Sequence, residues 1–151
     1  MKKVLAIVGL ILGLNSFAQT KNEQLFSAIQ NNQKAQVESL LNAGCDVNYF
    51  KTGSPDIRVS LLMAAVNANY SDIAKLLLDK KADVNWKDNL GNTAIMHAAY
   101  AGNTDMVKLL ISYGASVKDS NASTTVLNNA KASGNKELLA LVEKEMNKST
   151  K

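Results

Sequence analysis

The sequence predicts an all-α solenoid of about four helix-turn-helix units, joined by β-hairpin-like loops. Three observations predict this fold. Similar blocks recur along the chain at a fixed spacing, which is the signature of a repeat protein. Within each unit the apolar residues lie three and four positions apart in two runs, as amphipathic helices require. Glycines fall between the runs, where a chain of packed helices has to turn.

The repeat is clearest in the middle of the chain, where the spacing is 33 residues. Three blocks share that spacing: Ser60–Ala65 aligns with Thr93–Ala98, Ile73–Leu78 with Met106–Ile111, and Lys81–Val84 with Gly114–Val117. Less regular copies flank them, at spacings of 37 residues upstream and 32 downstream. The upstream copy includes an insertion, Lys51–Asp56. It is either a recognition loop or a change in sequence that the fold tolerates and that has no function. The predicted units are about 22–48, 49–85, 86–118 and 119–147.

Each unit pairs a short first helix with a second helix that ends at a turn. The first helix carries an alanine that lets a neighbouring helix approach closely: Ala28, Ala65, Ala98 or Ala130. The second helix ends near Gly44 or Gly114, because glycine adopts the left-handed conformation of a helix C-cap without steric cost. Polar stretches that contain Gly53 or Gly91 then predict a turn or hairpin leading to the next unit.

The motifs of the unit point to one repeat family. They are Thr93–Ala98 at the first helix, Leu76–Leu78 in the second, and Lys81–Asn85 after it. With these motifs the unit resembles the ankyrin repeat, and the resemblance covers about 22–145. It implies an ankyrin-repeat solenoid that binds proteins through its hairpin tips and the exposed side of its first helices.

The chain departs from the ankyrin pattern in two ways. The family's proline and histidine are absent, which implies that the usual threonine–histidine hydrogen bonds are lost. Their positions hold Leu61, Ala94 and Val126, and Met63, Met96 and Asn128. In addition, Lys81 stands at a cap position that favours glycine, at an expected cost of about 1 kcal/mol.

The first residues predict a signal peptide over 1–18. Lys2 and Lys3 precede an apolar run, Val4–Leu14, and small residues at Ser16 and Ala18 suit a signal peptidase that cleaves before Gln19. The run is too short to span a bilayer, so we expect no membrane insertion after cleavage. We therefore expect an exported protein, periplasmic or secreted, with a disordered tail at 148–151.

The composition offers little support for catalysis, metal binding or nucleic-acid binding. His97 is the sole histidine and Cys45 the sole cysteine, so neither a metal site nor a disulfide framework is expected. Cys45 is interpreted as a small buried thiol. Cleavage of the leader would leave 15 basic against 13 acidic residues, which is too balanced for a nucleic-acid-binding surface. We expect a monomer with no catalytic residues and no cofactor.

The resemblance places the partner-binding residues on the hairpins and the first helices. Mapped onto this chain they are Phe50, Asn67, Trp86, Lys87, Asn89, Leu90, Asn92 and Tyr100. Aromatic residues dominate interface hot spots, so Phe50, Trp86, Leu90 and Tyr100 are the leading candidates. The other interpretation is that Phe50 and Trp86 pack beneath their own hairpins.

Three functions remain open at this point. The first is a protein–protein interaction module with an unidentified protein partner. The second is a dedicated accessory, inhibitor or immunity protein of a periplasmic enzyme or toxin. The third, a hydrolase built around His97, lacks any nucleophile motif.

Overall fold

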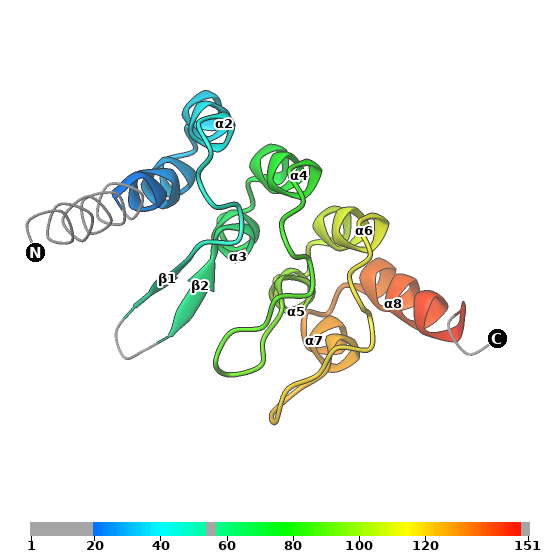
Figure 1. The fold of residues 1–151 in the computed structure, drawn as a ribbon. Coiled ribbons are helices and arrows are strands. Elements are labelled where there is room, and N and C mark those ends of the chain that lie inside the picture. The colour runs from blue at the N-terminus through cyan, green and yellow to red at the C-terminus, as the bar shows by residue number, and fades with distance from the viewer. Residues whose placement is uncertain (1–19, 54–56, 149–151) are drawn as a thin grey trace, which may run out of the picture.

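The computed structural model describes residues 20–53 and 57–148, and these form four stacked helix pairs (Figure 1). The predicted signal peptide and residues 149–151 lie outside the described residues. The pairs are residues 20–30 with α2 (Lys34–Asn42), α3 (Leu61–Asn67) with α4 (Ser71–Asp79), α5 (Ala94–Tyr100) with α6 (Thr104–Ser112), and α7 (Val126–Ala132) with α8 (Lys136–Lys148). The predicted solenoid of helix-turn-helix units is therefore confirmed.

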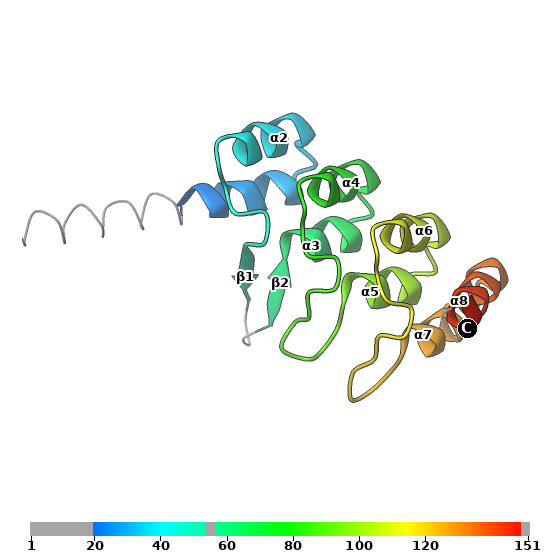
Figure 2. The same cartoon turned by 45° about the vertical axis from the view of Figure 1, so that its right-hand side comes forward.

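The helices form two layers, with the hairpins projecting beyond one of them (Figure 2). Residues 20–30, α3, α5 and α7 make the first-helix layer, while α2, α4, α6 and α8 make the second. The hairpin after the first pair is an antiparallel ribbon of β1 (Phe50–Thr52) and β2 (Arg58–Ser60). The hairpin after the third pair closes through a single bridge between Ser120 and Thr125.

The core lies between the two layers and between successive pairs. It is filled by leucine, isoleucine, methionine and valine side chains such as Leu61, Ile95 and Leu138. The alanines of the first helices are almost completely buried, since Ala65 and Ala130 expose none of their surface. Small side chains at these positions let neighbouring first helices pack closely, as the sequence predicted.

The turns after the second helices have the predicted left-handed conformation. Lys81 has a φ of +70°, and its counterparts Gly44 and Gly114 have φ values of +86° and +90°. Lys81 therefore occupies the cap position assigned to it from the sequence. An L-residue incurs a steric cost there that glycine does not.

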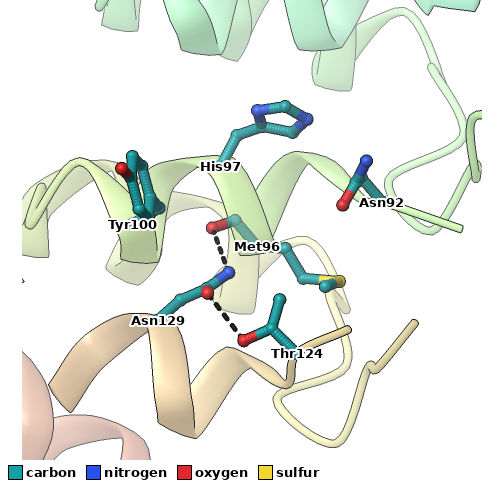
Figure 3. A pocket seen from close by; sticks show the side chains of 6 residues that line it. All are labelled: Asn92, Met96, His97, Tyr100, Thr124 and Asn129. Carbon is teal, nitrogen blue, oxygen red and sulfur yellow. Dashed lines mark hydrogen bonds between the residues drawn. The ribbon is translucent and has the colours of Figure 1, made fainter. Parts of the chain in front are cut away.

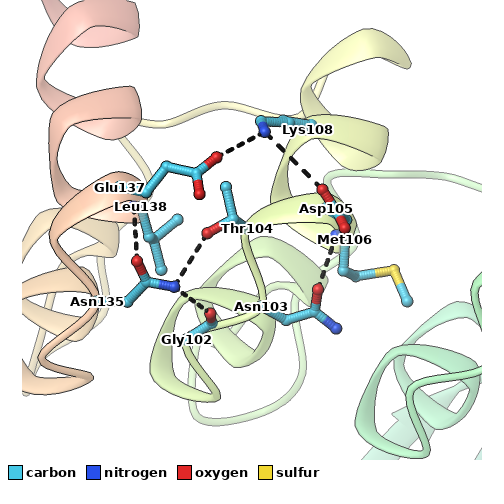
Figure 4. A network of polar contacts seen from close by, with 9 residues as sticks. All are labelled: Gly102, Asn103, Thr104, Asp105, Met106, Lys108, Asn135, Glu137 and Leu138. Carbon is cyan, nitrogen blue, oxygen red and sulfur yellow. Dashed lines mark hydrogen bonds and ion pairs between the residues drawn. The ribbon is translucent and has the colours of Figure 1, made fainter.

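Successive pairs are joined by asparagine side chains as well as by apolar packing (Figure 4). The Asn135 amide donates to the Gly102 carbonyl at 2.8 Å and to the Thr104 hydroxyl at 3.1 Å. Its oxygen accepts from the backbone N–H of Leu138 at 3.1 Å, which caps α8. One side chain therefore caps its own helix and holds the preceding turn.

Ion pairs gather on the second helices. Among them are Lys34–Asp72, Lys75–Asp79, Lys108–Asp105, Lys108–Glu137 and Lys148–Glu145. Across the ranges that the structure describes, no helix is long and apolar enough to cross a membrane. α8 includes Lys148, the first residue of the predicted tail.

Candidate binding surface

Large apolar side chains reach solvent on the hairpins and on α5. Within the part of the chain that the structure describes, the exposed large hydrophobic residues are Phe50 (39% exposed), Ile57 (39%), Leu90 (58%) and Tyr100 (71%). None of them lies on α2, α4, α6 or α8. Exposed apolar groups concentrated on one part of a surface are typical of interaction sites.

Phe50 and Trp86 stack on one another across neighbouring hairpins. Their ring centroids are 5.8 Å apart at an interplanar angle of 29°. The Arg58 guanidinium lies 5.4 Å from the centre of the Phe50 ring. Trp86 is half-buried, whereas Phe50 keeps an exposed edge. The two rings therefore join the first and second hairpins and still present an aromatic surface to solvent.

The tip of the second hairpin is held rigidly by Asp88, a buried residue. One carboxylate oxygen of Asp88 accepts from the backbone N–H groups of Leu90 and Asn92, both at 2.8 Å. The other accepts from the Asn92 side-chain amide at 2.9 Å. This closed loop leaves Leu90 exposed in a fixed position.

The hairpin tips are also bonded to one another. Asn89 accepts from the backbone N–H of Arg58 at 3.1 Å. Asn92 accepts from the side-chain amide of Asn121 at 2.6 Å. Asn89 and Asn92, predicted as partner contacts, thus have structural partners within the chain. Asn121 was absent from the predicted set, and only its place in the third hairpin could have indicated it.

A pocket of about 450 Å³ lies between α5 and α7. Its lining residues are Asn92, Met96, His97, Tyr100, Thr124 and Asn129 (Figure 3). Asn129 donates to the Met96 carbonyl at 3.1 Å and accepts from the Thr124 hydroxyl at 2.9 Å. The floor of this pocket is therefore polar and fixed, while Tyr100 stands exposed at its edge.

His97 is half-buried beside this pocket. Burial lowers the pKa of its imidazole, and the Asp88 carboxylate opposes that shift. Within 20–53 and 57–148 there is no group of three or more histidine, cysteine or acidic residues placed to hold a metal. The lining consists of amide, hydroxyl, thioether, phenol and imidazole groups, which suit recognition of another surface.

A second hollow of about 400 Å³ lies between residues 20–30, β2 and α3. It is lined by Phe26, Gln30, Val59, Ala64, Asn67 and Ala68. Asn67, predicted as a partner contact, is exposed at this hollow. The Lys51 ammonium lies 5.5 Å from the centre of the Phe26 ring. This hollow combines an apolar lining with a cation at its edge.

The structure thus divides the predicted residues among three places. Phe50 and Trp86 form the stacked pair, Asn92 and Tyr100 line the pocket, and Asn67 lines the hollow. Lys87 is exposed next to Trp86.

Cys45 has a free thiol that is half-buried, whereas a buried thiol was expected from the sequence. Burial raises its pKa, although the charge of Lys21 acts in the opposite direction. A raised pKa disfavours the reactive thiolate.

Stacked helix pairs with projecting hairpins define a helical-repeat scaffold, in which each unit packs on its neighbours. A family model described as ankyrin repeats, in three copies, matches residues 61–151. The chain therefore belongs to the ankyrin repeat family, whose repeats are protein–protein interaction modules.

Similar proteins come from viruses, bacteria, plants and animals. An ankyrin repeat protein of Acanthamoeba polyphaga mimivirus is 34% identical over 80 residues, covering 52% of this chain and 49% of the relative. One of Rickettsia bellii is 40% identical over 79 residues, covering 51% and 41%. One of Fowlpox virus is 40% identical over 75 residues, covering 50% and 11%. The chain thus spans half or less of the length of these relatives.

Proposed function

We propose that this chain is an exported protein that binds a protein partner through its hairpin tips and the exposed side of its first helices, without catalysing a reaction. The observation that carries the proposal is the exposure of Leu90 and Tyr100 on a surface whose backbone is already fixed. Aromatic and large apolar anchors supply most of the binding energy at interfaces. Such anchors would otherwise be costly to expose to water.

The hydrogen bonds between the hairpins support this function. Binding loses free energy when loops have to become ordered, and a loop that is already ordered avoids that loss. Here the Asp88 carboxylate fixes the second hairpin, and Asn89 and Asn92 tie it to its two neighbours. The apolar anchors are therefore presented without further ordering of the backbone.

Site-specific photocrosslinking tests this surface. A benzophenone amino acid replaces Leu90 or Tyr100 in the mature protein, and a control carries it at the exposed Glu38 of α2. We expect a protein crosslink from positions 90 and 100 and none from 38. Equal crosslinking at all three positions, or none at any, would contradict the proposed surface. One stoichiometric product would identify a dedicated accessory, inhibitor or immunity protein, whereas several would identify a general interaction module.

The export part of the proposal rests on the sequence of residues 1–18. Expression of the full chain with a C-terminal tag, followed by cell fractionation and N-terminal sequencing, tests it. We expect the mature chain to begin at Gln19 and to lie outside the cytoplasm. Light scattering on that mature chain should give the mass of a monomer. A cytoplasmic product that retains Met1 would refute export and leave the binding surface unaffected.

A further inference from the structure

Three cations on the first two hairpins lack an ion-pair partner among the described residues: Lys51, Arg58 and Lys87. This contrasts with the second helices, where ion pairs gather. Lys51 and Arg58 instead lie over the rings of Phe26 and Phe50. An aromatic ring attracts a cation through its electron-rich face but does not neutralise its charge. Among the described residues, no carboxylate forms an ion pair with these cations.

The register of the β1–β2 ribbon places the two contacts on opposite faces. Lys51 pairs with Val59, and Thr52 pairs with Arg58. Because side chains alternate along a strand, Lys51 and Val59 share one face, while Phe50 and Arg58 share the other. The first face meets the hollow lined by Phe26, and the second meets Trp86 of the next hairpin. Each face therefore joins a cation to an aromatic group.

The described acidic groups near these cations include Glu23 and Asp88. Glu23 is exposed on the helix of residues 20–30, and its charge raises the pKa of Tyr49 beside β1. The Asp88 carboxylate is buried and accepts three hydrogen bonds within its own loop. Asp56, in the inserted segment, lies outside the described residues. We call the group formed by Phe26, Lys51, Phe50, Arg58, Trp86 and Lys87 the basic-aromatic surface. The three charged side chains of this group are cations, and Glu23 lies outside it on the helix of residues 20–30.

We propose that the basic-aromatic surface binds an acidic segment of a protein partner. An apolar side chain of that segment enters the hollow lined by Phe26 and Val59, with one carboxylate against Lys51 on the same face of the ribbon. The segment then continues over to the opposite face, where a second carboxylate meets Arg58. This inference rests on the proposed function and names the chemistry of the partner. Arginine suits the task because its planar guanidinium can bind a carboxylate through two parallel hydrogen bonds.

The same features argue against a polyanion such as nucleic acid. The three cations are interleaved with apolar groups, whereas phosphate-binding surfaces rely on many closely spaced basic residues. The formal charge of the whole chain is only +4. A segment with both apolar and acidic side chains satisfies both kinds of group in the surface.

Selection from a random peptide library tests the proposal without knowledge of the partner. Displayed peptides of about 12 residues are selected on the mature protein, a length that spans about 40 Å when extended. We expect the selected peptides to be enriched in aspartate and glutamate next to a large apolar residue. Selected peptides without an acidic excess would overturn this inference while still supporting a binding module. Failure to select any peptide would count against the proposed function itself.

Charge reversal then locates the site, with the best selected peptide as the probe in fluorescence anisotropy. Lys51→Glu and Arg58→Glu should each weaken binding about tenfold, and higher ionic strength should weaken it further. Lys131→Glu changes the net charge equally on the exposed face of α7 and should have no effect. Equal weakening by all three variants, or tighter binding of a single-stranded DNA oligonucleotide than of the peptide, would overturn the proposal. Circular dichroism checks that each variant is folded.

Discussion

The side-chain oxygen of Asn48 accepts a hydrogen bond from the backbone N–H of Asp83, one repeat further along the chain, at 2.8 Å. Asn85 and Ser116 form the same contact at 3.0 Å. Asn22, in the helix of residues 20–30, instead accepts from the backbone N–H of Asp46 within its own unit, at 3.0 Å. Asn48 and Asn85 thus form a line of asparagines that connects the loops following the second helices. In a solenoid, where each unit contacts only its neighbours, such bonds contribute directly to the interface between units.

Asn85 should be the more informative member of this line to remove. It accepts from Ser116 and also donates to the Gly114 carbonyl at 3.1 Å. We expect Asn85→Ala to lower the free energy of unfolding by about 1–2 kcal/mol, measured by urea denaturation. Asn85→Asp keeps the acceptor oxygen, so its free energy of unfolding should lie between those of the wild type and Asn85→Ala. The control Asn128→Ala, on the exposed face of α7, should leave stability unchanged or slightly raised. An equal loss in the control would contradict a specific role for Asn85.

Lys81→Gly should stabilise the protein by about 1 kcal/mol, because glycine relieves the cost of a φ of +70°. The melting temperature should rise by about 4 °C. The reciprocal change, Gly114→Lys, should lower it by a similar amount. A Cβ at Gly114 meets no atom within 4 Å, so the loss there would come from the backbone conformation alone. If both variants melted at the wild-type temperature, the strain assigned to this position would be absent.

The repeat spacing was sufficient to predict the stacked helix pairs and the caps. It aligns Lys81 with Gly114, and that alignment alone assigns a left-handed conformation to a lysine. Such assignments succeed because the backbone geometry of a repeat depends on its period and its turn residues. The close approach of first helices at Ala65 and Ala98 follows from the same alignment.

Contacts between hairpins could not be predicted in this way. The insertion between β1 and β2 interrupts the register, so no counterpart exists from which to infer the stacking of Phe50 on Trp86. The bond between Asn92 and Asn121 depends on how two loops bend toward each other, which local sequence does not specify. The sequence therefore predicted a set of residues for the candidate surface. Their division among the stacked pair, the pocket and the hollow depends on the three-dimensional arrangement of the loops.

Thr93 and Thr125 are the N-cap residues of first helices in successive repeats, but only one of their hydroxyl groups is hydrogen-bonded. The Thr125 hydroxyl accepts from the backbone N–H of Asn128 at 3.1 Å, whereas the fully buried Thr93 hydroxyl has no hydrogen-bond partner among the described residues. The expected loss of the threonine–histidine bond is thus seen at Thr93. We expect Thr93→Val to leave stability unchanged or raise it by up to about 1 kcal/mol, because an unpaired buried hydroxyl is unfavourable.

The matched change Thr125→Val should lower stability by about 1 kcal/mol through loss of the cap. Thermal melts of both variants under identical conditions make the comparison. A similar loss in both would mean that the Thr93 hydroxyl has a partner after all.

His97 should make stability fall as the pH drops below the ordinary imidazole pKa of 6.5. Burial holds the pKa of the folded imidazole below its ordinary value of 6.5, so the unfolded chain takes up the proton first as the pH falls. The contribution of His97 is therefore complete above 6.5 and is lost as the pH falls toward the lowered folded pKa. Urea midpoints at several pH values should decline more steeply for the wild type than for His97→Gln. Carboxylates titrate in both proteins, so the difference isolates the histidine. The control Tyr100→Phe, on the same helix, should keep the wild-type slope. Identical slopes for the wild type, His97→Gln and Tyr100→Phe would show that the histidine is not shielded from water.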